Sequence, residues 1–202
     1  MIVLLFSLTV HETAHAWTAN QFGDPTARLL GRISLNPIVH ADPIGTILFP
    51  LISMVSGAPL LGWAKPVPVN LRYLRHPRRD YMLVAAAGPT SNLVLALFAA
   101  LLLLLVPISP TLDEPNVSVP IAAILRQTMR LNVLLAVFNM IPIPPLDGGN
   151  VLAGLLPPPL ADTFNRLRPY GFLLLYALIL TNGFSYIVLP PYLFIMSWLP
   201  TQ

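Results

Sequence analysis

The chain has 202 residues and a mean hydropathy of +0.73; 55% of its residues are apolar and only 9% are charged. An ordinary soluble domain is about one quarter charged, so this composition argues against a water-soluble globular protein. The net charge of +3 is small and the basic residues gather in short loops, which disfavours a nucleic-acid partner. The absence of cysteine excludes disulfides, thiolate metal ligands and cysteine nucleophiles.

Long uncharged stretches mark the segments that can enter a membrane. Residues 43–64, 81–112 and 169–202 contain no charged side chain, and about 18 such residues suffice for a helix to cross a bilayer. The apolar start of the chain lacks the basic residues that open a signal peptide, so we expect it to stay as a membrane helix. The sequence therefore predicts an all-α polytopic membrane protein, a bundle of about five to six transmembrane helices.

The expected elements follow one another with short connections. Helices are predicted at residues 1–20, 43–56, 81–106, 120–140 and 148–156, and in a last apolar region from residue 170, with breaks at 183 and 190–191. Residues 22–42 are expected to form a polar loop with one short strand at 32–35. Prolines and glycines interrupt residues 57–70, which predicts a short re-entrant segment, extended at 65–70. No repeat or long linker divides the chain, so residues 1–202 are expected to form a single membrane-embedded domain.

A polar cluster, His11-Glu12-Thr13-Ala14-His15, interrupts the first apolar helix. Residues four apart lie on one face of a helix, so both imidazoles can bind the same metal ion with Glu12 beside it. Zinc with an open coordination position lowers the pKa of bound water, whose proton Glu12 could accept. Ionisable residues within a membrane helix are costly unless they are paired, hydrated or bound to metal, which favours a metal site over a chance cluster.

The residues alone leave the third metal ligand open, although a catalytic zinc usually has three protein ligands. Asp147 follows a proline-rich break in the apolar part of the chain, and can be a ligand, an N-cap of the next helix, or both. His40 and Asp42 precede an expected helix start, where a polar loop and a cap are the simpler interpretation; His40 is the second candidate. His76 lies among arginines and is expected to be solvated.

Three segments together resemble the site-2 protease family of intramembrane zinc metalloproteases. They are His11-Glu12-Thr13-Ala14-His15, Gly88-Pro89-x-x-Asn92, and the run Asn139-Met140-Ile141-Pro142-Ile143-Pro144-Pro145-Leu146-Asp147-Gly148. Their order, spacing and membrane setting match over nearly the whole chain. Many members carry a PDZ domain or a nucleotide-binding module, but no loop here is long enough for either, so the resemblance implies the compact form of the family.

The resemblance also implies roles for individual residues. One zinc ion would be held by His11, His15 and Asp147, with Glu12 as the general base. Asn139 and Asn92 would hold the substrate strand or the developing oxyanion, although both amides can equally satisfy backbone groups of broken helices.

The implied activity is hydrolysis of peptide bonds in or near transmembrane segments of other membrane proteins, in contact with membrane lipid. A substrate helix must unwind locally, and the extended residues 65–70 could hold it by strand addition or serve only as a structural plug. A metal-binding scaffold or transporter and a zinc amidase acting on a lipid are the alternatives. Glu12 disfavours the scaffold, because a purely structural site gains little from a carboxylate that is not a ligand.

The basic residues predict an orientation through the positive-inside rule. If Met1 faces outside, all lysines and arginines except Arg126 and Arg130 fall at the inner face. This assignment requires the re-entrant segment, which leaves the basic loop at residues 72–79 inside as well. We therefore expect a multi-pass protein of the cell membrane with its active site toward the cytosolic side.

Overall fold

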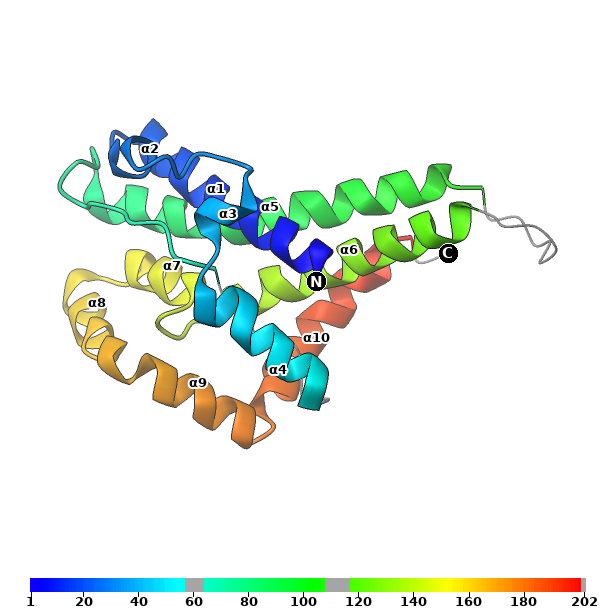
Figure 1. Cartoon of the computed structure of the whole chain (residues 1–202). Coiled ribbons are helices and arrows are strands. Elements are labelled where there is room, and N and C mark those ends of the chain that lie inside the picture. Colours follow the sequence, from blue (N-terminus) through cyan, green and yellow to red (C-terminus); the bar gives the residue numbers. More distant parts are fainter. Residues whose placement is uncertain (57–63, 108–116, 201–202) are drawn as a thin grey trace.

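The computed structural model describes residues 1–56, 64–107 and 117–200, and all regular structure in these residues is helical (Figure 1). The elements in chain order are α1 (Ile2–Gln21), α2 (Thr26–Leu29), α3 (Pro37–His40), η1 (Pro43–Leu48, a π-helix), α4 (Phe49–Ser56), α5 (Pro77–Leu105), α6 (Ser118–Asn139), α7 (Asp147–Leu155), α8 (Pro158–Asn165), η2 (Arg168–Tyr170, a 3₁₀ helix), α9 (Gly171–Leu180) and α10 (Gly183–Trp198). The all-helical class is confirmed.

The predicted count of five to six membrane-spanning helices is not confirmed. Only α5 and α6, of the described helices, are each long and apolar enough to span a bilayer; a third span results if α8–α9 and α10, bent by 82°, count as one. Helix α1 has 20 residues, but His11, Glu12 and His15 lower its mean hydropathy. The same polar residues that could bind a metal therefore keep α1 out of the set of candidate membrane spans.

Two local predictions were wrong. Residues 32–35 form no strand: the Arg32 N–H closes a turn on the Ala27 carbonyl at 2.8 Å, and the Arg32 side chain donates to the Val39 carbonyl, so this stretch is a folded connection. Helix α10 continues through Pro190 and Pro191, as membrane helices often tolerate proline. The predicted break near residue 183 is confirmed, since the chain turns at Asn182, whose φ of 56° is left-handed.

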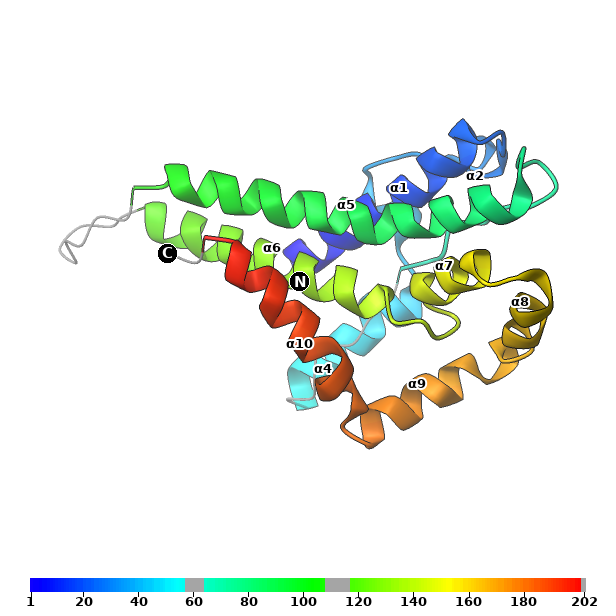
Figure 2. The same ribbon diagram turned by 180° about the vertical axis from the view of Figure 1, so that it is seen from behind.

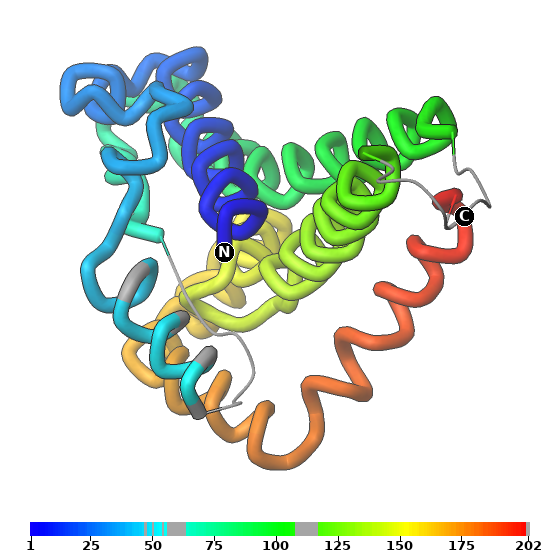
Figure 3. Tube along the Cα trace, turned by 45° about the vertical axis from the view of Figure 1, so that its right-hand side comes forward, coloured from blue at the N-terminus to red at the C-terminus, as the bar shows by residue number. Residues whose placement is uncertain are grey.

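Helix α5 is the centre of the packed part of the molecule. It contacts α1, α6 and α7, and α10 returns to lie beside α6 (Figure 2). Many side chains on the contact faces are small, which lets the helices approach closely. In α1, α5 and α6, the alanines with at most 2% of their surface exposed are Ala16 and Ala19 of α1, Ala96, Ala99 and Ala100 of α5, and Ala122 and Ala136 of α6. Helices α8, α9 and α10 form an arm that leaves this core after α7 and rejoins it at α6 (Figure 3).

The chain between α1 and α5 returns to the end of the molecule from which it started. The Arg75 N–H donates to the Phe22 carbonyl at 3.2 Å, and the Asn70 N–H donates to the buried Asp24 carboxylate at 2.6 Å. Helices α1 and α5 consequently run antiparallel, with the connections after α1 and before α5 at the same end (Figure 1). This is the geometry that a re-entrant connection requires. The predicted turning point at residues 57–63 lies outside the described residues.

Candidate metal centre

Two histidines of α1 point to the same place. His11 and His15 are four residues apart, and their Nε2 atoms lie 3.0 Å from each other. Both are buried, with 5% and 8% of their surface exposed. The helical spacing that the sequence predicted therefore brings the two imidazoles together on the face of α1 that packs against α5.

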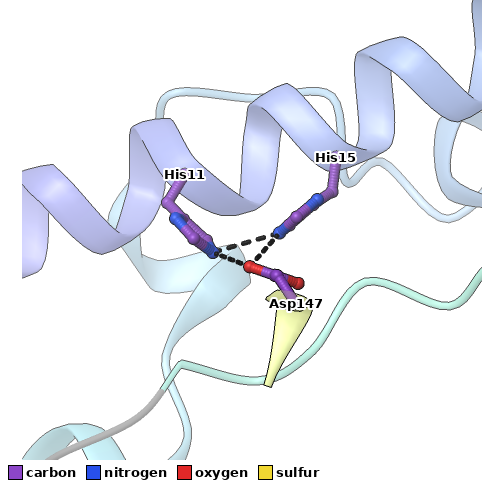
Figure 4. A group of neighbouring side chains, drawn as sticks. All are labelled: His11, His15 and Asp147. Carbon is purple, nitrogen blue, oxygen red and sulfur yellow. Dashed lines mark hydrogen bonds and ion pairs between the residues drawn. The ribbon is translucent and has the colours of Figure 1, made fainter. Parts of the chain in front are cut away.

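Asp147 faces the two imidazoles from another helix, α7 (Figure 4). It is the first residue of α7, and its Oδ2 lies 3.1 Å from His11 Nε2 and 3.4 Å from His15 Nε2. The Asp147 side chain makes no capping hydrogen bond, and the N-cap position belongs to Leu146. The N-cap interpretation of Asp147 is thus wrong, because the carboxylate faces the imidazoles and not its own helix.

The protonation of the two imidazoles follows from their second contacts. The Nδ1 atom of His11 lies 2.6 Å from Asn92 Oδ1, and the Nδ1 atom of His15 lies 2.7 Å from the Val84 carbonyl oxygen. Both oxygens accept hydrogen bonds, so each Nδ1 carries a proton, and in the neutral imidazole that binds a metal each Nε2 presents a lone pair. This is how second contacts commonly orient metal-binding histidines.

These tautomers leave three electron-rich atoms facing one another, and the Asp147 Oδ2 is a buried atom without a hydrogen-bond partner in the described part of the chain. Such atoms repel unless a cation lies between them. Ligand atoms around a tetrahedral zinc ion with bonds of about 2.0–2.1 Å lie about 3.3 Å apart, close to the observed 3.0–3.4 Å. The donor set His11, His15 and Asp147 therefore fits a zinc ion.

Glycines allow the helices to converge at this point. A Cβ atom on Gly88 of α5 would lie 2.4 Å from His15 Nε2 and 2.6 Å from His11 Nε2, where only hydrogen fits. A Cβ atom on Gly148 would lie 2.3 Å from the Met140 carbonyl oxygen, so this glycine lets α7 begin directly against the end of α6. The resemblance singled out both positions as parts of motifs, and the structure supplies the steric reason.

A cavity of about 250 Å³ opens beside the three donor atoms. Glu12 lines it, and its Oε2 accepts a hydrogen bond from the Val67 N–H at 3.0 Å. Asn139 lines it too, while donating from Nδ2 to the Leu135 carbonyl of its own helix at 2.9 Å. Tyr81 is a further lining residue that no sequence signal indicated. The cavity thus brings a carboxylate and an amide next to the donor set.

Asn92 does not line the cavity. It is fully buried behind His11, is not among the residues that line the cavity, and its Nδ2 donates to Asn132 Oδ1 at 2.7 Å. An amide so enclosed does not reach a substrate in this structure.

The other candidate histidines lie outside the donor set. His40 is buried and hydrogen-bonds through Nε2 to the Ser34 carbonyl at 2.8 Å. Asp42 caps the following helix by accepting from the Ile44 and Gly45 N–H groups, as predicted. His76 is largely exposed in the basic loop, also as predicted.

The backbone N–H groups of the extended segment at residues 65–70 are mostly hydrogen-bonded within the protein. The N–H groups of Lys65, Val67 and Asn70 bind the His40 carbonyl, Glu12 and Asp24, and Pro66 and Pro68 carry no N–H. In the described contacts only the Val69 N–H is left for another strand. Strand addition needs alternate free donors along an edge, so the structure favours the plug interpretation of this segment.

Two imidazoles and a carboxylate around one point, with a further carboxylate in the adjoining cavity, form the kind of site that a metalloprotease uses, in a chain with candidate membrane-spanning helices. Comparison with known proteins gives the family. Residues 1–123 match the family model of peptidase family M50, and the chain belongs to this family, the site-2 proteases. It is a zinc metalloprotease.

Similar proteins carry matching names. The chain is 40% identical over 190 residues to YwhC of Bacillus subtilis, which is named a zinc metalloprotease; the match covers 94% of this chain and 84% of YwhC. It is 33% identical to Rip2 of Mycolicibacterium smegmatis and 36% identical to Rip2 of Mycobacterium tuberculosis, both also named zinc metalloproteases. These matches cover 90% and 87% of this chain and 66% and 63% of the relatives. No solved structure matches the chain significantly.

Proposed function

We propose that this protein hydrolyses peptide bonds in or near transmembrane segments of other membrane proteins, with His11, His15 and Asp147 as ligands of one zinc ion and Glu12 as the general base. The observation that carries the proposal is the convergence of the three donor atoms within 3.0–3.4 Å beside a cavity that Glu12 lines. When bound, zinc would make water a nucleophile at neutral pH and polarise the scissile carbonyl.

Glu12 has the contacts that a general base needs. It is outside the donor set, and the Val67 N–H holds its Oε2. Its Oε1 has no hydrogen-bond partner among the described residues and is available to accept a proton in the cavity. The same carboxyl group can then donate that proton to the leaving amine, because a general base in the first half of hydrolysis acts as the acid in the second.

Asn139 is the better placed of the two predicted amides for binding the substrate. It lines the cavity, and its Oδ1 has no hydrogen-bond partner in the described part of the chain. We assign this oxygen to a backbone N–H of the substrate next to the scissile bond.

The backbone of a helical substrate hides the bond to be cut, because its carbonyl groups are already hydrogen-bonded within the helix. A helical segment would therefore have to unwind at that bond before the bond could reach the zinc ligands and Glu12 in the cavity. Substrates with helix-breaking residues at that point are expected to be cleaved fastest.

For localisation we propose the cell membrane, with the active site toward the cytosol. Arg28 and Arg32 after α1 and the basic loop before α5 lie at the same end of the molecule, as the positive-inside rule favours for the inner face. The variant Arg75→Cys carries the chain's only thiol. It should resist an impermeant thiol reagent in intact cells and react after permeabilisation; labelling in intact cells would reverse the orientation.

The decisive experiment for the function is Glu12→Gln. It should keep stoichiometric zinc and lower cleavage of single-span membrane substrates by two or more orders of magnitude. Asp42→Asn is the matched carboxylate-to-amide control, since asparagine caps a helix almost as well as aspartate. Near-normal cleavage by Glu12→Gln would contradict the mechanism, and a wild-type protein that holds zinc but cleaves no membrane substrate would support the scaffold or the amidase instead.

A further inference from the structure

A chain of buried polar side chains crosses the interface of three helices behind His11. Ser7 of α1, Asn92 of α5 and Asn132 of α6 each have 0% of their surface exposed. Asn92 Oδ1 lies 2.6 Å from His11 Nδ1, Asn92 Nδ2 donates to Asn132 Oδ1 at 2.7 Å, and Asn132 Nδ2 donates to Ser7 Oγ at 2.8 Å. The hydrogen bonds form an unbroken path from His11 into the core.

The far end of this path fixes its direction. Asn132 Nδ2 also donates to the Thr128 carbonyl at 2.8 Å, and a backbone carbonyl can only accept. The Asn132 amide is therefore oriented with its oxygen toward Asn92. Asn92 must in turn present its Nδ2 to Asn132, where the Ser7 carbonyl, 3.5 Å away, favours the same orientation. Only the Asn92 oxygen is left for His11.

We propose that Asn92 and Asn132 are positioning residues that lock His11 in the tautomer with its proton on Nδ1 and its Nε2 lone pair directed at the metal. This inference rests on the proposed function of His11 as a zinc ligand. It replaces the substrate or oxyanion role that the resemblance implied for Asn92. It also adds Asn132, which lies in none of the motifs.

His11 needs such a lock more than an exposed histidine would. In water the two neutral tautomers interchange, and the wrong one would aim an N–H at the metal and at Asp147 Oδ2, 3.1 Å away. Helix packing alone does not require the path, because apolar residues of similar shape can replace two paired amides at little cost. A directed chain of amides ending on a metal ligand is better explained by the tautomer that it selects.

Two substitutions at Asn92 separate positioning from packing. Asn92→Asp keeps an oxygen that accepts the His11 Nδ1 proton, as carboxylates do behind many zinc-bound histidines, but loses the donor to Asn132. Asn92→Leu keeps similar volume and loses the acceptor. Positioning predicts that Asn92→Leu weakens zinc affinity about 10- to 100-fold, whereas Asn92→Asp stays within about 10-fold of wild type. A packing role predicts the opposite order, since Asn92→Asp buries a charge against an amide oxygen.

Changes further along the path give an internal control. Ser7→Ala removes one acceptor but leaves the Thr128 carbonyl, so thermal stability should fall while zinc affinity stays unchanged. Asn132→Leu frees the Asn92 amide to turn over, so zinc affinity should fall, but by less than in Asn92→Leu.

The measurements are zinc competition with a calibrated chelator and ¹⁵N spectra of histidine-labelled protein in detergent. The His11 signal, identified by its loss in His11→Gln, should report a protonated Nδ1 in wild type and a mixture of tautomers in Asn92→Leu. Equal zinc affinity in wild type and Asn92→Leu, or weaker binding by Asn92→Asp than by Asn92→Leu, would overturn the proposal. A wild-type protein that holds no zinc at all would instead refute the proposed function.

Discussion

The core of α1, α5, α6 and α7 and the arm of α8, α9 and α10 solve the problem of a membrane environment in opposite ways. The core buries polar side chains, and the residues concerned are Ser7, Thr9, His11, His15, Asp80, Asn92 and Asn132. The arm buries only Ala161, Gly171 and Val188 of its described residues and exposes large apolar ones, with Phe172 and Tyr186 at 75% and 81%. The core buries polar groups, and the arm exposes apolar groups.

The contrast indicates which region can hold a chemically active site. In lipid, exposed apolar side chains cost nothing and their burial contributes little, so the surface of the arm needs no protein partner. Polar groups inside a membrane protein are expensive unless each finds a partner. The core therefore carries the chemistry, and the arm can change at its surface with small effect. Three substitutions test this division.

The largest effect is expected from a single methyl group on α5. Gly88→Ala places a Cβ atom 2.4–2.6 Å from the Nε2 atoms of both histidines, neither of which can move without leaving the donor set. Zinc occupancy and cleavage should both be lost. Gly183→Ala in the arm is the control: its Cβ would lie 2.6 Å from Leu178 Cδ1, the far end of a side chain that can rotate away, and 3.2 Å from the Leu178 carbonyl oxygen, which a shift of a few tenths of an ångström relieves.

Metal analysis and a cleavage assay on the two purified variants decide the result. Full zinc occupancy in Gly88→Ala would mean that the helices separate easily at the site. The core would then tolerate an added methyl group as well as the arm does.

A smaller but still large effect is expected from Asp147→Asn. The amide keeps the shape of the side chain but removes the negative charge, and it should weaken zinc affinity by more than about 100-fold, the upper range for changes behind a ligand. Because Asp147 makes no capping bond, helix content and the stability of the zinc-free protein should stay nearly unchanged. Asp162→Asn, on the exposed face of α8, makes the same chemical change in the arm.

Chelator competition and circular dichroism measure the two quantities separately. Wild-type zinc affinity in Asp147→Asn would remove Asp147 from the donor set. Asp162→Asn should match wild type in both measurements.

Contacts between residues close together in the sequence could be predicted, whereas contacts between distant residues could not. The spacing of His11 and His15 fixes their meeting, because helix geometry alone puts residues four apart on one face. Asp147 lies 132 positions beyond His15, and spacing could not choose between a ligand and a cap; only the resemblance pointed to it, and only the packing of α7 against α5 brings it to the histidines. The strand predicted at 32–35 is absent because a strand needs a second strand to pair with, and a short stretch of sequence does not show whether one is there.

Asn132 shows a signal that was present and not used. A polar side chain in a membrane-spanning helix is costly in the same way as His11 in α1, and this argument marks Asn132 together with Arg126 and Arg130 of the same helix. The partners of Asn132, however, come from α1 and α5, so its role in orienting His11 could follow only from the assembled core.

The smallest effect concerns stability and compares one buried with one exposed side chain. Met129 of α6 is fully buried against Ala99 and Ala100 of α5, whereas Phe172 of α9 is 75% exposed. Met129→Ala leaves a cavity in a close-packed interface and should cost on the order of 2 kcal/mol or more of the free energy of unfolding. Phe172→Ala removes more atoms, yet should change the free energy of unfolding by less than about 0.5 kcal/mol, because most of the ring faces lipid or detergent and not other residues. Thermal unfolding of both variants in the same detergent gives the comparison; a loss in Phe172→Ala as large as that in Met129→Ala would mean that the arm is covered by protein and not by lipid.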